Sequence, residues 1–206
     1  MHCNITRTYQ ALCSIKVHTE PRAASIASIK HAGKSSDSLV QALVHIPKTL
    51  VFAPSAVKVN NAYQKQRNRL MKHGAAFIAN NCSYQDCTVC RLHSNTEIEV
   101  QKYVSNTFCK IGGHCRVCFA TAVMEHGIDC DDVDRVVHVG CPTSPEALVQ
   151  GLGRAGRRPQ TFVYSIVFWN EQDFRDRNGR SFNVDMIRYC KNQTLCRFKL
   201  LRSFFI

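Results

Sequence analysis

Two arginines in the segment Gly153-Arg154-Ala155-Gly156-Arg157 are the residues best suited to chemistry. Arg154 and Arg157 are three residues apart, so on a helical turn their side chains share one face. The small residues around them allow another surface to approach closely. A pair of guanidinium groups can bind a phosphoryl group and stabilise the charge that builds on it during transfer. The segment therefore predicts a phosphate-facing site.

The residues before this segment predict the elements that position it. Arg116 to Thr121 and Val133 to Val139 are short apolar runs, typical of buried parallel strands whose carboxyl ends carry ligand-binding loops. Between them, Gly127-Ile128-Asp129 predicts a tight turn that presents one carboxylate. Ser144-Pro145-Glu146 predicts a helix start, because it combines a hydroxyl N-cap, a proline in the first turn and an acid near the positive end of the helix macrodipole.

Three further runs favour strands of the same sheet, namely Thr49 to Ala53, Thr88 to His93 and Thr161 to Trp169. A helix from Ser55 to about His73 is expected after the first run, and a capping box at Thr96 to Glu99 predicts the start of another. The alternation of strands and helices predicts an α/β fold, with a mainly parallel sheet flanked by helices and a short helical C-terminal tail.

Two motifs in this order carry a resemblance to a known family. Ala120-Thr121 with Gly127-Ile128-Asp129 resembles motif V of superfamily 2 helicases, and Gln150 with Gly153-Arg154-Ala155-Gly156-Arg157 resembles motif VI. The pair is most similar to that of the RecQ family of DNA helicases, over about Lys48 to Phe205. The resemblance implies a RecA-like lobe of the P-loop-NTPase type, the second of two lobes that clamp ATP with Mg²⁺ and move 3′ to 5′ on DNA.

The resemblance also implies roles at the nucleotide. Arg157 matches the arginine finger that reaches the γ-phosphate of ATP held by the first lobe, and Arg154 is its catalytic partner. Gln150, Asp129 and Gly127 match positions that contact the nucleotide. The first lobe would be a necessary partner for hydrolysis.

The DNA-facing residues implied by the resemblance are Thr121, His93 and Ser94. The expected partner is single-stranded or forked DNA, in DNA repair or recombination. Composition agrees, since 27 Lys and Arg stand against 15 Asp and Glu in 206 residues, a formal net charge of +12. A strongly basic chain favours a polyanionic partner.

Two functional alternatives stay open. Glu125 stands where the family usually has a glycine, and Pro159 follows Arg158 where the family usually turns on Asp-Gly. Gly33-Lys34-Ser35 ends like a Walker A loop, but Ser28 occupies the place of its first glycine and no Asp-Glu-x-His box follows. The chain is therefore expected to be either part of an ATP-dependent helicase or a non-catalytic nucleic-acid-binding or regulatory remnant of a helicase lobe.

The cysteines suggest zinc in two places. Cys87-x-x-Cys90 and Cys115-x-x-Cys118 have the spacing of a four-thiolate site, but Cys90 and Cys118 fall within expected strands, where a thiol behaves as a buried hydrophobe. Cys196 begins a stretch that resembles the start of the RecQ zinc-binding region and matches its first ligand. One thiolate cannot hold structural zinc, so no complete zinc site is expected.

The expected organisation is a poorly ordered connection over 1–37, the helicase C-terminal lobe over 38–170 and an incomplete zinc-binding helical region over 171–206. No window has the apolar core of a signal peptide or the length needed to cross a bilayer. We therefore expect reduced cysteines and a nuclear protein, or a cytoplasmic one in a prokaryotic source.

Overall fold

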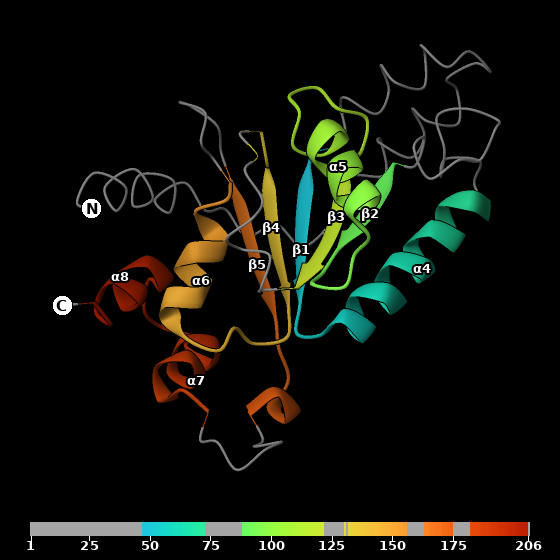
Figure 1. Cartoon of the computed structure of the whole chain (residues 1–206). Helices are drawn as coiled ribbons and strands as arrows, with labels where there is room; N and C mark the ends of the chain where they lie inside the picture. The colour runs from blue at the N-terminus through green and yellow to red at the C-terminus, as the bar shows by residue number, and fades with distance from the viewer. Residues whose placement is uncertain are drawn as a thin grey trace.

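The computed structural model describes residues 47–72, 88–121, 130, 132–155, 163–174 and 182–205. Five strands form one sheet in the spatial order β2-β3-β1-β4-β5, and all neighbours are parallel (Figure 1). The strands are β1 (Thr49–Ala53), β2 (Val89–Leu92), β3 (Val117–Thr121), β4 (Arg135–Val139) and β5 (Tyr164–Phe168). The predicted α/β fold with a parallel sheet is confirmed.

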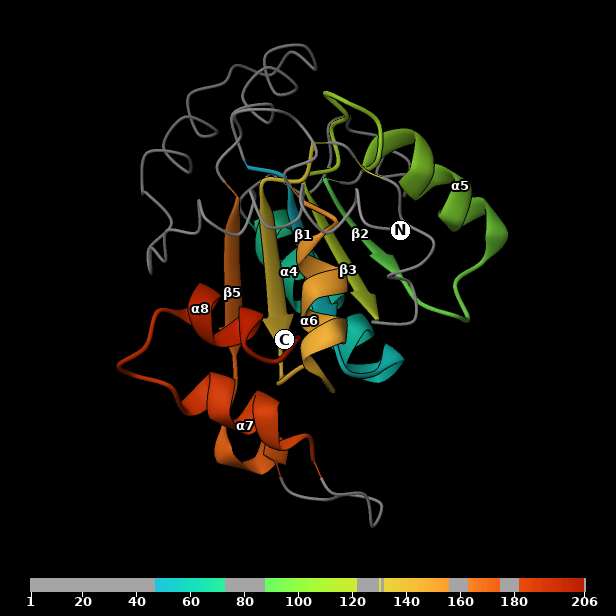
Figure 2. The ribbon, with the colours of Figure 1, turned by 90° about the vertical axis from the view of Figure 1, so that its left-hand side faces the viewer.

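Helices cover both faces of the sheet. On one face, α4 (Ala56–Lys72) packs its Val59 against Val51 of β1. On the other face lie α5 (Ile98–Thr107) and α6 (Pro145–Leu152). Figure 2 shows α4 behind the strands and α6 in front of them. The strands are short and apolar because both of their faces are covered.

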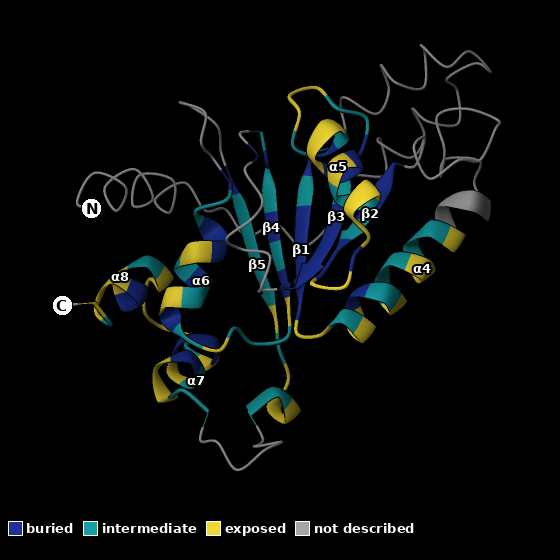
Figure 3. Cartoon of the chain, viewed as in Figure 1, coloured by how far each residue is buried: buried dark blue, intermediate teal, exposed yellow. Residues whose placement is uncertain are grey.

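The alternation of side chains along β1 shows how the two cores form. Leu50 and Phe52 point into the core beneath α5, whereas Val51 and Ala53 point towards α4. All four are buried, and the central strands are buried along most of their length (Figure 3). This two-residue period follows from the pleat of the strand.

The C-terminal tail packs back onto the sheet domain. It contains a 3₁₀ turn (Glu171–Phe174), α7 (Val184–Lys191) and α8 (Arg197–Arg202). Leu200 and Leu201 of α8 are each 3% exposed and join a cluster with Leu148 and Leu152 of α6. Cys196 is the N-cap of α8 and is exposed. None of the described helices is both long and apolar enough to cross a membrane.

The predicted capping box at Thr96 is wrong. The N-cap of α5 is Glu97, and no side chain caps this helix. The Thr96 hydroxyl instead accepts a hydrogen bond from the His93 backbone N–H at 2.8 Å, and the Thr96 N–H bonds the His93 carbonyl at 2.9 Å. The Thr96 hydroxyl thus stabilises the turn after β2, whereas it was expected to cap the start of α5.

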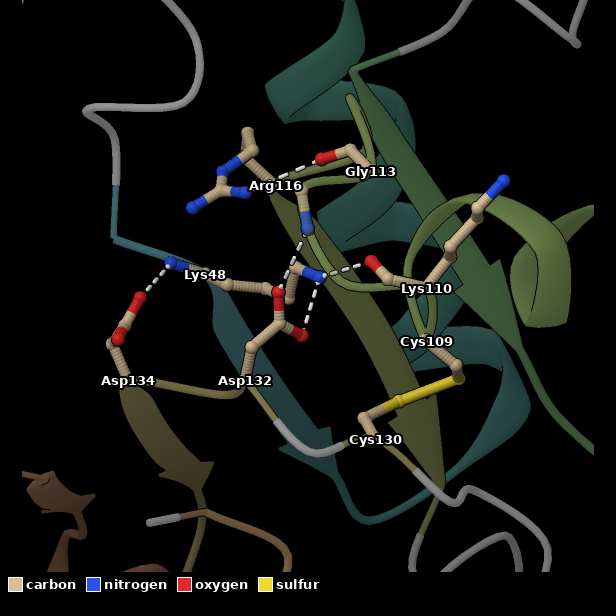
Figure 4. Close-up of polar contacts among 9 residues, drawn as sticks. Lys48, Cys109, Lys110, Gly113, Arg116, Cys130, Asp132 and Asp134 are labelled. Carbon is tan, nitrogen blue, oxygen red and sulfur yellow. Dashed lines mark hydrogen bonds and ion pairs between the residues drawn. A yellow bond between two sulfur atoms is a disulfide. The ribbon is translucent and has the colours of Figure 1, made fainter. Parts of the chain in front are cut away.

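The expectation that all cysteines are reduced is also wrong. A disulfide joins Cys109, after α5, to Cys130, before β4 (Figure 4). Cys90 and Cys118 are free and buried in neighbouring strands, as expected for thiols that act as small hydrophobes. Among the described residues, no group of three or more His, Cys, Asp or Glu side chains could hold a metal ion. Cys87 lies outside them.

Candidate functional site

Five of the predicted site residues lie in the described part of the chain, in two separate groups. Thr121, His93 and Ser94 lie at the carboxyl edge of the sheet. Gln150 and Arg154 lie on α6 and just after it, and α6 runs back along the sheet from that edge (Figure 1). The other three predicted residues, Gly127, Asp129 and Arg157, fall outside the described residues.

Parallel pairing brings the first group together. Leu92 pairs with Ala120 and Ala53 pairs with Thr121, so the chain leaves β2, β3 and β1 along one line. His93 and Thr121 are buried there, at 7% and 8% exposure, whereas Ser94 is exposed. Ser94 is therefore the member of the group that can contact a ligand directly.

His93 is held by a residue that the sequence analysis missed. Its Nε2 lies 3.2 Å from Oδ1 of Asn60 on α4, and the same oxygen accepts a hydrogen bond from Arg91 at 2.8 Å. Burial lowers the pKa of His93, and the positive charge of Arg91 lowers it further. The lowered pKa favours the neutral imidazole, and its contact with Asn60 ties the end of β2 to α4. Asn60 gave no sequence signal because it lies among polar residues of a long helix.

Exposed polar groups continue this edge onto α4. Ser55 is exposed, and its hydroxyl accepts a hydrogen bond from the Lys58 backbone N–H at 3.3 Å. Lys58 and Asn95 are exposed as well. We call Ser55, Lys58, Ser94 and Asn95 the carboxyl-edge rim. Its hydroxyl, amide and ammonium groups are the kinds that contact phosphate and sugar in nucleic-acid complexes.

The second group depends on how α6 begins and ends. Ser144 caps the helix by accepting the Ala147 N–H at 3.2 Å, and Pro145 occupies the first turn, as predicted. The Ser144 hydrogen bond lowers the pKa of Glu146. Leu148 and Leu152 are buried, which leaves Gln150 exposed on the outer side.

Arg154 does not lie on the helix face predicted for it. The helix ends at Leu152 with Gly153 as C-cap, and Arg154 lies in the turn that follows. Its backbone N–H bonds the Gly151 carbonyl at 3.2 Å, and Ala155 is buried with its N–H on the Leu152 carbonyl at 3.1 Å. These two hydrogen bonds form a tight turn that holds Arg154 between the end of α6 and the buried Ala155.

A glycine brings α6 unusually close to β4. A Cβ on Gly151 would lie 2.7 Å from Nε2 of His138, a distance that Cβ atoms do not adopt. His138 is buried and stacks on Phe52 with ring centroids 5.1 Å apart. Neither of its ring nitrogens has a hydrogen-bond partner within the described residues, and burial lowers its pKa to about 4. Gly151 is therefore required by packing beneath Gln150 and Arg154.

A buried ion pair lies at the opposite edge of the sheet. Lys48 is fully buried, and its Nζ lies 2.6 Å from Asp132 and 2.9 Å from the Lys110 carbonyl (Figure 4). The Lys48 backbone N–H donates to Asp134 at 2.7 Å. Burial lowers the pKa of Lys48, and Asp132 opposes that shift. This cluster ties the starts of β1 and β4 together and lies away from both groups.

The chain matches known helicase domains. The helicase conserved C-terminal domain matches residues 35–159. The chain is 30% identical over 152 residues to RecQ-like DNA helicase BLM of Xenopus laevis, covering 66% of this chain and 10% of that protein. It is 38% identical over 65 residues to ATP-dependent DNA helicase Q4 of Mus musculus, covering 32% and 5%. It is 32% identical over 106 residues to ATP-dependent helicase SGS1 of Saccharomyces cerevisiae, covering 44% and 7%.

Two solved structures share the fold. Mss116p DEAD-box helicase domain 2, bound to an RNA duplex, has a TM-score of 0.50 at 15% identity and covers 75% of this chain and 54% of that one. Mycobacterium smegmatis helicase Lhr, bound to ssDNA and AMP-PNP, has a TM-score of 0.52 at 22% identity and covers 68% and 17%. These likenesses confirm the RecA-like fold of a helicase C-terminal domain. The chain spans a tenth or less of the length of the three curated relatives.

Proposed function

Because the chain belongs to the family of the helicase conserved C-terminal domain, with RecQ-family helicases among its relatives, we propose that it is the second motor lobe of a RecQ-type DNA helicase. In this role it couples ATP hydrolysis to 3′-to-5′ movement along DNA when a first RecA-like lobe is present. The observation that carries the proposal is the placement of Gln150 on α6, and of Arg154 in the turn after it, because this helix is fixed at its start by Ser144 and beneath by His138.

The nucleotide would lie against the outer side of α6 and the turn after it. Gln150 is exposed and Arg154 follows it within one turn, so both would lie beside a phosphate held by another lobe. Arg157 acts as the arginine finger, with Asp129 and Gly127 as further nucleotide contacts. The first lobe supplies the Walker A and Walker B residues that hold ATP and Mg²⁺. ATP and Mg²⁺ would be held by the first lobe, and the arginines of this chain would stabilise the charge on the transferring phosphoryl group.

The DNA partner would lie along the carboxyl-edge rim. Ser94 and Asn95 offer exposed polar groups after β2, and Ser55 and Lys58 offer them after β1. Thr121 and His93 lie behind them, buried, and orient the loops. With a formal net charge of +12, the chain favours a nucleic acid by the release of counterions, and the RecQ relatives make single-stranded or forked DNA the proposed partner. A nuclear location follows from this role in a eukaryote.

A second function is favoured by one residue. Glu125 places a carboxylate where the family has a glycine near DNA or phosphate, which adds bulk and repulsion. If this substitution uncouples ATP from DNA, the chain is a non-catalytic nucleic-acid-binding lobe. Residues 38–170 form the lobe in either case, and residues 171–206 form the start of a RecQ-type helical region that docks on it.

ATP turnover separates the two functions. The 206-residue chain would be assayed alone and mixed with the first RecA-like lobe of a RecQ helicase, each with and without single-stranded DNA. The motor-lobe proposal predicts no turnover by either lobe alone and DNA-stimulated turnover by the mixture. DNA binding by the mixture without turnover, in a mixture shown to form a complex, would favour the binding lobe. A Glu125→Gly variant that restores turnover would identify the cause.

A further inference from the structure

Two free cysteines from distant parts of the chain meet between the sheet domain and its tail. Cys141 lies in the turn between β4 and α6, and Cys190 lies in α7, 49 residues later. Their sulfur atoms are 3.4 Å apart, within hydrogen-bonding distance. Cys190 is 3% exposed and Cys141 is half-buried, so the pair is reached from the Cys141 side.

The surroundings hold both thiols in place. They belong to the apolar cluster that joins α6, α7 and α8, in which Met186 and Tyr189 of α7 are buried. A side chain in such packing has few rotamers, so the two sulfur atoms stay close. This short separation is therefore a property of the fold and not of a mobile loop.

The hydrogen bond and the charges around the pair shift the pKa values of the two thiols in opposite directions. The hydrogen bond with Cys141 lowers the pKa of Cys190, and the positive charge of Arg197 lowers it further, against burial and Asp173. Arg197 is fixed nearby because its guanidinium donates to the Tyr189 carbonyl at 2.8 Å. The same hydrogen bond is the main cause that raises the pKa of Cys141, with burial second. Of the two thiols, Cys190 is therefore the one that loses its proton more readily.

The other free cysteines differ from this pair. Cys90, Cys115 and Cys118 also lie together in the core, but burial first, and then hydrogen bonds with the two neighbouring thiols, raise the pKa of Cys90. A thiol with a raised pKa holds little thiolate and reacts slowly with oxidants. Cys196 is exposed, but it is the N-cap of α8 and its pKa is lowered by backbone hydrogen bonds from Lys199 and Phe198. Cys196 is therefore a control for a reactive thiol at the surface.

We propose that Cys141 and Cys190 are an oxidation site at which a peroxide makes a reversible disulfide between the sheet domain and its tail. The Cys190 thiolate attacks one peroxide oxygen, the O–O bond breaks, and hydroxide leaves, giving a sulfenic acid. The Cys141 sulfur then attacks the Cys190 sulfur, the S–O bond breaks, and water leaves with the Cys141 proton. The two thiols lose two electrons and two protons in total, and hydrogen peroxide becomes two molecules of water.

The bond would tie α7 to the turn from which α6 begins. Cys141 precedes the Ser144 N-cap by three residues, so the link fixes the start of the helix that carries Gln150. The tail would then no longer separate from the lobe. The chemistry of the pair does not depend on the proposed helicase function, so failure of one leaves the other standing.

Peptide mapping tests the proposal directly. The reduced, folded chain would be treated with hydrogen peroxide, blocked with N-ethylmaleimide, and digested with trypsin without reduction. Cleavage after Arg135, Arg154, Arg188, Lys191 and Arg197 puts Cys141 in peptide 136–154, Cys190 in 189–191 and Cys196 in 192–197. The expected product is 136–154 joined to 189–191, lost after dithiothreitol. The Cys109–Cys130 pair, in peptides 103–110 and 117–135, is an internal control for a disulfide.

Three variants sharpen the test. Cys141→Ser and Cys190→Ser abolish the joined peptide, whereas Cys196→Ser retains it. Because Cys190→Ser places a hydroxyl in a buried site, the peroxide-treated unaltered chain would also be melted beside the peroxide-treated Cys141→Ser variant, in which Cys109 and Cys130 can still pair but the proposed bond cannot form. The oxidised form is expected to melt several degrees higher, since the closed loop restricts the unfolded chain. Both cysteines recovered as maleimide adducts after peroxide treatment, or Cys190 joined to Cys196 instead, would overturn the proposal.

Discussion

The imidazole of His138 lies directly beneath Gly151, where α6 crosses β4, and a Cβ at residue 151 would come within 2.7 Å of Nε2. The histidine and the glycine are complementary, because the ring occupies the space that a side chain on the helix would need. The contact sets the height of α6 above the sheet. It therefore also sets the position of Gln150 and of the turn that holds Arg154.

Substitution of Gly151 by alanine tests this contact, because the contact decides whether the free energy of unfolding rises or falls. Glycine to alanine within a helix ordinarily stabilises by up to about 1 kcal/mol. Here we expect Gly151→Ala to lower the free energy of unfolding by roughly 1–3 kcal/mol, the range for overpacking. Urea unfolding would measure it, with exposed Gln150→Ala on the same helix as the control. A stabilised Gly151→Ala variant, or no recovery in the His138→Ala/Gly151→Ala double variant, would contradict the contact.

Acid should unfold the chain partly through His138. Burial lowers its pKa to about 4, below the ordinary value of 6.5, so the unfolded state binds the proton more readily. The contribution to stability is complete above pH 6.5 and is lost as the pH falls towards 4, by roughly 3 kcal/mol at 1.36 kcal/mol per pKa unit. Unfolding from pH 7 to 4 would measure it. The His138→Phe variant should show a shallower pH slope, and an identical slope would be inconsistent with a buried neutral imidazole.

The buried Lys48–Asp132 pair should contribute far more to the free energy of unfolding than the Glu171–Lys191 pair at the surface. Asp132→Asn leaves the fully buried Lys48 ammonium without its counter-charge, and we expect a loss of roughly 3–5 kcal/mol of stability. Glu171→Gln is the matched control, because Glu171 pairs with Lys191 at 3.0 Å while 65% exposed. Solvent screening limits that loss to less than about 1 kcal/mol. Equal losses in the two variants, measured by urea unfolding, would refute the difference.

A negative charge on the carboxyl-edge rim should weaken DNA binding. Ser94 is exposed after β2, and Ser94→Asp would place a carboxylate against the phosphates. We expect roughly tenfold weaker binding of labelled single-stranded DNA in fluorescence anisotropy at low salt, with the difference shrinking as salt rises. Ser203→Asp at the end of α8 adds the same charge away from the rim. If both variants bind equally weakly, net charge and not the rim explains the affinity.

Local patterns in the sequence predicted the helices and strands but not the contacts between them. Short apolar runs predicted all five strands, and Ser144-Pro145 predicted the start of α6, because these signals depend on near neighbours. The His138–Gly151 contact and the Cys109–Cys130 disulfide join residues far apart in sequence, so no spacing revealed them.

Competing local interactions explain the errors within segments. The Thr96 hydroxyl bonds the turn after His93 and does not cap α5, and α6 ends at Leu152 with Gly153 as C-cap, before Arg154. In both places the residues take part in a turn, although the sequence predicted that they belong to a helix. The two helicase motifs, by contrast, identified the family correctly. Their recognition depends on the order of short residue patterns and not on where each helix begins or ends.

The second-lobe role is tested most directly by the turnover number of ATP hydrolysis in the complex with a RecQ first lobe and single-stranded DNA. We predict that Arg157→Ala lowers DNA-stimulated turnover by roughly 10³-fold or more, as expected for an arginine finger, with little change in ATP binding. Arg188→Ala, an exposed arginine of α7, should leave turnover unchanged. Full turnover by the Arg157→Ala complex would contradict the assignment of this chain as the lobe that completes the ATP site.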